Sequence, residues 1–134
     1  MAELMWLALL GHLVGDFLLQ SKAMGLRKSE KGRAGLWLCT IHVTIYTAVI
    51  MIFWGTKDPL VALAVFAPHW VIDRWSLANK WSGLIKGRTF EAAIVSTDKY
   101  REFDVAFTSI VYKEIDATMH LLCLWAIVEL MLTR

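Results

Sequence analysis

Histidine and aspartate recur together at helical spacing along this chain. Three pairs lie four residues apart: His12 with Asp16, His69 with Asp73, and Asp116 with His120. Because residues four apart share one face of a helix, each pair would present an imidazole and a carboxylate side by side. Imidazole nitrogens and carboxylate oxygens are ligands for zinc, manganese and iron in proteins. The spacing therefore predicts a site that binds a divalent metal or moves protons.

The fourth histidine, His42, lies in the most apolar segment of the sequence. Residues 34–54 read AGLWLCTIHVTIYTAVIMIFW and contain no carboxylate, lysine or arginine. At 1.5 Å per residue, a helix of this length crosses a hydrocarbon core of about 30 Å. His42 is therefore predicted to lie inside a membrane.

The composition also favours a membrane protein. Of the 134 residues, 57% are hydrophobic and seven are tryptophan, and the mean hydropathy is +0.52. An ordinary soluble domain is less apolar than this. Three further segments, 4–19, 59–77 and 111–132, qualify as spans although each contains ionisable residues. We predict an all-α, polytopic membrane protein, a single domain over residues 1–134 with four transmembrane helices.

Basic residues concentrate in two of the connecting segments. Between the first and second spans lie Lys22, Arg27, Lys28, Lys31 and Arg33, and between the third and fourth lie Lys80, Lys86, Arg88, Lys99, Arg101 and Lys113. By the positive-inside rule both segments, about 20–33 and 78–110, are cytoplasmic, and both termini lie on the other side. At a formal net charge of +2, most of the lysines are expected to meet anionic lipid headgroups, and nucleic acid is not an expected partner.

The segment 78–110 is predicted to be a long cytoplasmic loop between the third and fourth helices. It is longer than a plain connection requires. Its apolar pieces, 90–95 and 105–112, are too short to span a membrane, so they would lie along the interface or extend the fourth helix inward. A solvated loop with one amphipathic turn is the alternative.

Depth in the membrane gives a second argument for a metal. Counted from the cytoplasmic ends of their spans, His12, His42 and His69 each lie about eight residues, or roughly 12 Å, inside. An aspartate at mid-bilayer costs about 2.5–3.5 kcal/mol on insertion scales, and a shared cation would remove that cost. The predicted ligands in this layer are His12, Asp16, His42, His69, Asp73, Asp116 and His120.

The ligand set leaves the number of ions open. Two ions about 3.5–4 Å apart, bridged by a carboxylate, would use all the ligands. A single ion would instead have aspartates that hold its histidines in place. Zinc is the preferred ion, with manganese or iron as alternatives. A proton or ion pathway, and polar contacts that only join helices, are the competing interpretations.

Residues around the predicted ligands fit a closely packed helical interior. Gly11 and Gly15 form a small-xxx-small pair that lets another helix approach. Gln20 extends the polar face of the first helix one turn toward the cytosol. Asp58 followed by Pro59 is a typical helix start, with the aspartate as N-cap and the proline at the first helical position.

The motifs HLVGDFLLQ (12–20), HWVID (69–73) and DATMHL (116–121), with the isolated His42, resemble an uncharacterised family of small bacterial and phage inner-membrane proteins. Its members look like four-helix proteins with H-x-x-G-D-F-x-x-Q, a lone histidine, H-x-x-x-D and D-Q-x-x-H. Ala117 stands where that family usually has glutamine. The likeness covers most of the chain except the long loop, and it implies a bacterial inner membrane. The arrangement is also distantly similar to membrane-bound metal-dependent hydrolases.

The preferred interpretation is a membrane-embedded, metal-dependent hydrolase that acts at the cytoplasmic leaflet on an amphiphilic, (phospho)lipid-like substrate. Asp16, Asp73 and Asp116 would serve as further ligands, as a bridge or as general base. The alternatives are a non-enzymatic metal or proton transporter or channel, and a phage-type membrane accessory or lysis protein. Since four short helices barely enclose a site, a homo-oligomer is expected.

Overall fold

The computed structural model describes residues 1–133, which form helices and connecting turns with no strand among them. The elements in chain order are α1 (Ala2–Leu13), the π-helix η1 (Val14–Leu18), α2 (Lys22–Arg27), α3 (Arg33–Trp54), α4 (Pro59–Arg74), α5 (Leu77–Lys86), α6 (Phe90–Val95) and α7 (Arg101–Leu132). The predicted all-α class is therefore confirmed.

Five of these elements correspond to the four predicted spans, because α1 and η1 together make up the first. By length and composition, α3 and α7 are long and apolar enough to cross a membrane, and they are the candidates of this kind within residues 1–133. Helix α1 with η1, and helix α4, are shorter. The helix start predicted at Asp58 is confirmed, because its side chain accepts a hydrogen bond from the Leu60 amide at 2.8 Å and Pro59 opens α4.

The segment 78–110 is largely helical rather than a loop. Ala78 and Ser82, one turn apart on α5, are buried where α5 packs on α7, while Trp81 and Leu84 stay exposed. An amphipathic pattern of this kind forms a helix once one side is covered. The alternative of a solvated loop with one amphipathic turn does not hold, because the segment contains α5, α6 and the start of α7. Of the two alternatives for residues 105–112, extension of the fourth helix is what occurs.

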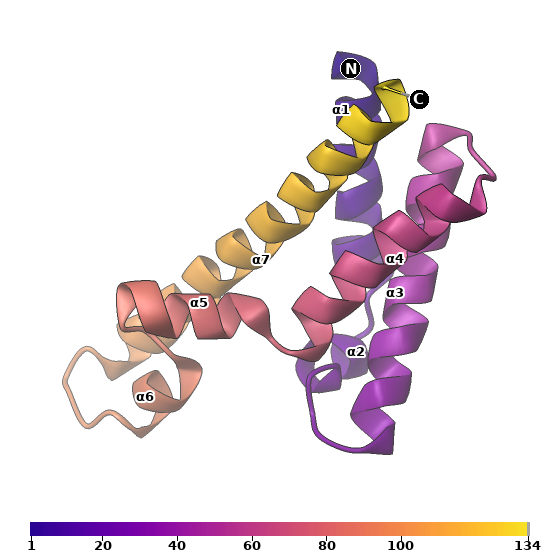
Figure 1. Ribbon diagram of the computed structural model, residues 1–134. Coiled ribbons are helices and arrows are strands. Elements are labelled where there is room, and N and C mark those ends of the chain that lie inside the picture. The colour runs from indigo at the N-terminus through magenta and orange to yellow at the C-terminus, as the bar shows by residue number, and fades with distance from the viewer. Residues whose placement is uncertain (134) are drawn as a thin grey trace.

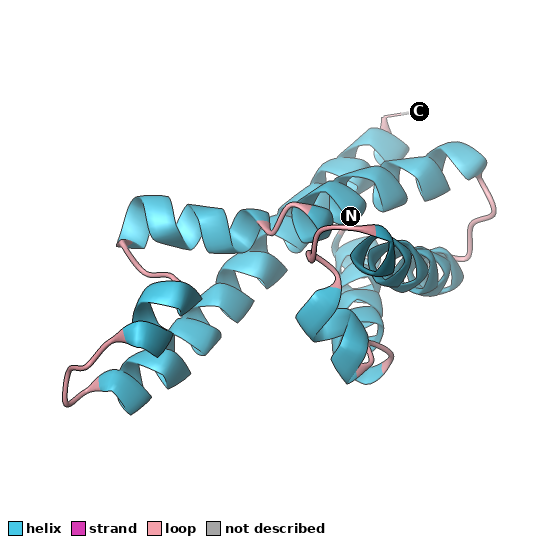
Figure 2. Cartoon of the chain, turned by 90° about the horizontal axis from the view of Figure 1, so that it is seen from below, coloured by secondary structure: helices cyan, strands magenta, loops and turns pink. Residues whose placement is uncertain are grey.

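The termini and the short helices lie toward opposite ends of the molecule. The N- and C-termini and the turn between α3 and α4 lie at one end, and α2, α5 and α6 lie toward the other (Figure 1). Viewed from below, α5, α6 and the start of α7 form an arm beside the other helices (Figure 2). The apolar core, drawn from α1, α3, α4 and α7, comprises Ala8, Tyr46, Ile50, Trp54, Val61, Val65, Leu124, Ile127 and Val128.

Two glycines allow the first helix to approach α3 closely. A Cβ atom at Gly11 would lie 2.8 Å from Cδ1 of Ile50, and one at Gly15 would lie 2.7 Å from Cδ2 of Tyr46. Real Cβ atoms do not approach other heavy atoms this closely. The Tyr46 ring therefore requires glycine at position 15, whereas at position 11 the obstacle is the end of a flexible side chain. The small-xxx-small pair thus acts as the sequence predicts, and it brings η1, which contains Asp16, against α3.

Candidate metal centre

The predicted ligand residues come from α1, η1, α3, α4 and α7 and converge on one interior region. The four histidines and Asp73 are each 1–2% exposed, and Asp16 and Asp116 are partly buried at its edge. Helical spacing places each pair on one face, and the packing of five elements then turns those faces toward each other.

Three atoms form a triangle with equal sides. His42 Nε2, His69 Nε2 and Asp73 Oδ2 are each 3.2 Å from the other two. Asp16 Oδ1 adds a fourth corner, 3.2 Å from His42 Nε2 and 3.7 Å from His69 Nε2. Ligand atoms around a tetrahedral zinc with bonds of 2.0–2.1 Å lie about 3.3–3.4 Å apart. The edges of 3.2 Å among these atoms are close to that spacing, and the ligand atoms of Asp16, His42 and His69 all lie within 4.8 Å of one another. Asp16, His42, His69 and Asp73 are hereafter called the ligand cluster.

The surroundings of His42 Nε2 are hard to satisfy by hydrogen bonding alone. Besides the other three atoms of the ligand cluster, the Gln20 side-chain nitrogen lies 3.0 Å away. One ring nitrogen offers either a single hydrogen or a single lone pair. It cannot pair with two carboxylates and two nitrogens at once, whereas a shared cation would engage the ring nitrogens and carboxylate oxygens together.

His120 is oriented so that one ring nitrogen is available. Its Nδ1 donates a hydrogen bond to the Asp116 carbonyl oxygen at 2.8 Å. This assigns the lone pair to Nε2, which has no hydrogen-bonding partner among residues 1–133 and lies 3.8 Å from Asp73 Oδ1. Such backbone contacts commonly fix the tautomer of metal-binding histidines.

His120 also belongs to two further groups whose ligand atoms lie within 4.8 Å of one another. One group joins it to His69 and Asp73, and the other joins it to Asp16 and Asp116. The buried His and Asp residues could therefore hold a metal ion, as predicted, although the groups share members. A second ion would have to compete with the ligand cluster for His69 or Asp16.

His12 lies beside these groups rather than within one of them. Its Nδ1 is 3.2 Å from Asp16 Oδ2 and 3.2 Å from the Tyr46 hydroxyl. The Tyr46 ring packs on His69, with ring centroids 3.8 Å apart. The structure therefore places His12 where it orients Asp16, and its predicted role as a ligand stays a prediction.

Lys28 was not predicted to belong to the site. The loop lysines are expected mostly to meet lipid headgroups, but Lys28 is an exception, because it is 5% exposed and its Nζ lies 2.8 Å from Asp73 Oδ1. Burial alone would lower the pKa of Lys28, but the carboxylates of Asp73 and Asp116 raise it above the ordinary value for lysine. The available sequence signal was Ser21, whose side chain caps α2 and so begins the helix that turns Lys28 inward.

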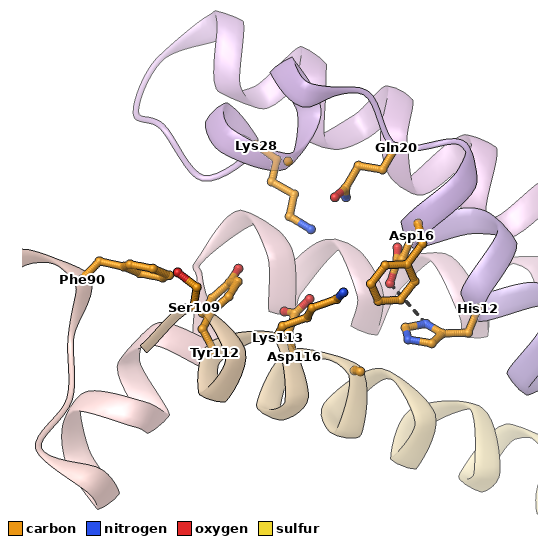
Figure 3. A pocket seen from close by; sticks show the side chains of 12 residues that line it. His12, Asp16, Gln20, Lys28, Phe90, Ser109, Tyr112, Lys113 and Asp116 are labelled. Atoms are coloured by element: carbon orange, nitrogen blue, oxygen red, sulfur yellow. Dashed lines mark ion pairs between the residues drawn. The ribbon is translucent and has the colours of Figure 1, made fainter. Parts of the chain in front are cut away.

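A cavity of about 320 Å³ adjoins these residues. Side chains of η1 and α2 line one side and side chains of α7 line the other, with Phe90 at the outer end (Figure 3). This cavity is hereafter called the polar pocket. The residues that line it include His12, Asp16, Phe17, Gln20, Lys28, Phe90, Ser109, Tyr112, Lys113 and Asp116. A small molecule that enters here would meet carboxylates, two ammonium groups and aromatic rings.

Comparison with known proteins gives a family but no activity. No curated protein and no solved structure matches the chain. Residues 4–134 match the family described as Protein of unknown function (DUF3307). Since the match covers nearly the whole sequence, the chain belongs to this family.

Proposed function

We propose that the protein is a membrane-embedded, metal-dependent hydrolase that acts from the cytoplasmic leaflet on an amphiphilic, (phospho)lipid-like substrate. The observation that carries the proposal is the triangle of His42 Nε2, His69 Nε2 and Asp73 Oδ2 at 3.2 Å, completed by Asp16. Imidazole and carboxylate ligands without thiolate are typical of catalytic rather than structural zinc sites.

A membrane location is supported by the outer surfaces of α1, α3, α4 and α7. Each exposes large apolar side chains, among them Trp6, Leu10, Trp37, Ile52, Leu63 and Leu122. In water such surfaces would be a liability, whereas in lipid they are the expected exterior. In this proposal α1 with η1, α3, α4 and α7 all cross a bacterial inner membrane. The basic segments then face the cytoplasm, and both termini face the other side.

In the proposed centre Asp16, His42, His69 and Asp73 would hold a zinc ion, with manganese or iron as alternatives. Because catalytic zinc keeps one position free of protein ligands, one of the four would give way, or the ion would take a fifth ligand, when water or substrate binds. Bound there, the ion would supply Lewis-acid activation of water and of a scissile phosphoryl or carbonyl group. His12 Nδ1 lies 3.2 Å from Asp16 Oδ2 and orients that carboxylate. The Gln20 side-chain nitrogen lies 3.4 Å from His42 Nδ1, the ring nitrogen that the ion would leave free. Asp116 lies at the wall of the polar pocket, where its carboxylate can accept a proton from water or pass one to a leaving group.

The arrangement favours a hydrolase over a transporter. Beyond the ligand cluster, toward the termini, the four helices close on the apolar core of Ile50, Trp54, Val61, Leu124 and Val128. A transit path needs polar groups on both sides of its binding site. A pocket that opens at one end and is sealed by apolar packing at the other suits a substrate that enters and leaves by the same route.

Elemental analysis of the purified protein tests the proposal. We expect stoichiometric zinc in the wild type and in Thr44→Ala, a control on the exposed face of α3, and loss of zinc in His42→Ala and Asp73→Ala. Wild-type protein with bound metal should then release product from phospholipid vesicles, and both site variants should not. Metal-free wild type from a chelator-free preparation would contradict the proposal.

A further inference from the structure

Lys28 shares the Asp73 carboxylate with the ligand cluster. Asp73 Oδ2 lies 3.2 Å from the Nε2 atoms of both His42 and His69, and Asp73 Oδ1 lies 2.8 Å from Lys28 Nζ. One oxygen therefore faces the proposed ion and the other faces a fixed ammonium group. A lysine this deeply buried is unusual in a connecting segment, and such a residue is ordinarily paired, as Lys28 is.

The Lys28 ammonium occupies the place that a second metal ion would need in the group formed by His69, Asp73 and His120. Asp73 Oδ1 is the oxygen that a second ion would share with His120 Nε2, which lies 3.8 Å from it. Lys28 Nζ already contacts that oxygen, and two positive charges at this separation repel each other strongly in a desolvated interior. The group of His69, Asp73 and His120 also lacks a metal ligand, because His69 Nε2 already faces the ligand cluster.

The balance of charge agrees with a single divalent ion. Three carboxylates, Asp16, Asp73 and Asp116, face one ammonium group, Lys28, and the histidines are taken as neutral ligands. Two negative charges remain, and one divalent ion neutralises them. A second cation, Lys113, extends into the polar pocket from α7 and faces Lys28 across it (Figure 3). With one ion bound, the pocket would therefore attract an anion.

The walls of the polar pocket suit the rest of an amphiphile. Lys113 Nζ lies 4.1 Å from the centroid of the Phe17 ring, and Phe17 and Phe90 both line the pocket. A charged head could thus lie between the lysines while an apolar chain leaves past the aromatic rings. Lysine binds phosphate as a compact point charge and needs no fixed orientation of the ester.

We propose that Lys28 takes the place of a second metal ion: the centre holds one divalent ion, and Lys28, with Lys113 opposite, binds the phosphate group of an amphiphilic phosphate ester. This inference rests on the proposed function, because the carboxylates repel an anion until the ion is bound. In two-metal hydrolases the second ion stabilises the oxygens of the transferred group. Here an ammonium group provides that positive charge.

Metal content and direct binding test the inference together. The probe is hexyl phosphate, titrated calorimetrically into zinc-loaded protein in nanodiscs of zwitterionic lipid, with hexanol and inorganic phosphate as comparisons. We expect one zinc per chain. Hexyl phosphate should bind at least tenfold more weakly to Lys28→Met than to wild type, whereas Lys28→Arg, which keeps the charge, should retain most of the affinity. Lys31→Met, an exposed lysine in the same segment, should match the wild type.

Lys113→Met separates anion binding from metal binding, because Lys113 is outside the ligand cluster. It should lose affinity for hexyl phosphate while it keeps its zinc. Equal affinity for inorganic phosphate and hexyl phosphate would support the anion site but make free phosphate its ligand. Two zinc ions per wild-type chain, or undiminished hexyl phosphate binding by folded Lys28→Met, would overturn this inference and leave the proposed function standing. Wild type without zinc would overturn both.

Discussion

His42 and His69 face each other through their Nε2 atoms at 3.2 Å. The two residues lie on α3 and α4, neighbouring helices joined by the short turn after Gly55, which takes a left-handed conformation (φ +64°) at the end of α3. A helical hairpin with such a short connection fixes the relative depth of its two helices. Three of the four residues of the ligand cluster therefore lie on one hairpin, because Asp73 follows His69 one turn later on the same face of α4.

Removal of the metal should destabilise the protein. An ion that binds the folded state alone contributes about 2.7 kcal/mol when its free concentration is 100 times its Kd. We expect a chelator to lower the temperature of unfolding of detergent-purified wild type by several degrees, and added zinc to restore it. The double variant His42→Ala/His69→Ala should show no response to either reagent. An unchanged unfolding temperature in chelated wild type would count against a metal in this site.

The sequence predicted that the histidines and aspartates of the site lie close together, but not the tautomers and contacts of their side chains. Spacing assigns His120 and Asp116 to one helix face, yet the tautomer of His120 depends on a contact with a backbone oxygen that only the folded helix provides. Membrane hydropathy located α3 accurately, because a long uncharged segment has few alternatives. Lys28 was missed because lysines in a basic loop look alike, and only the packing of α2 distinguishes the buried one. Helix α5 was missed although Leu77, Trp81, Leu84 and Ile85 recur at helical spacing, and the side that packs on α7 is instead that of Ala78 and Ser82.

Gly15→Ala should damage the site more than Gly11→Ala does. The added methyl at Gly15 would meet the Tyr46 ring at 2.7 Å, and that ring is held between His12 and His69. At Gly11 the obstacle is the terminal methyl of Ile50, which can rotate away. Overpacking costs about 1–3 kcal/mol, and at Gly15 it would also move the neighbouring Asp16.

The measurement for this pair is thermal unfolding together with zinc content. We expect Gly15→Ala to lose both stability and zinc, and Gly11→Ala to keep its zinc with a smaller loss of stability. Equal behaviour of the two variants would show that the contact of η1 with α3 does not position Asp16.

Tyr46→Phe should show what the hydroxyl of Tyr46 contributes to stability and zinc binding, apart from what the ring contributes. The hydroxyl contacts His12 Nδ1 at 3.2 Å, while the ring belongs to the apolar core. Loss of one hydrogen bond costs about 0.5–1.5 kcal/mol, and truncation of a core aromatic ring costs about 3–5 kcal/mol. We expect Tyr46→Phe to fold and retain zinc, and Tyr46→Ala to unfold far more readily in denaturant titrations. Loss of zinc from Tyr46→Phe would instead make the hydroxyl essential to the centre.

The proposed four-span topology makes a prediction about which turns face the cytoplasm. If α1 with η1, α3, α4 and α7 all cross the membrane, the segment around α2 and the segment around α6 lie on one side, and the turn between α3 and α4 lies on the other (Figure 1). Three exposed positions report on these places: Ser29, Thr97 and Lys57. Each is changed to cysteine in a background that lacks Cys39 and Cys123, and is then labelled with a membrane-impermeant maleimide.

In intact spheroplasts we expect Lys57→Cys to react and both Ser29→Cys and Thr97→Cys to stay unlabelled until the membrane is opened. The physical reason is the concentration of lysine and arginine at the α2 and α6 end, which the translocation machinery retains in the cytoplasm. The ligand cluster would then open toward the cytoplasmic leaflet through the polar pocket, which Lys28 and Lys113 line. Labelling of Ser29→Cys or Thr97→Cys in intact spheroplasts would place that opening on the opposite side and exclude a cytoplasmic substrate.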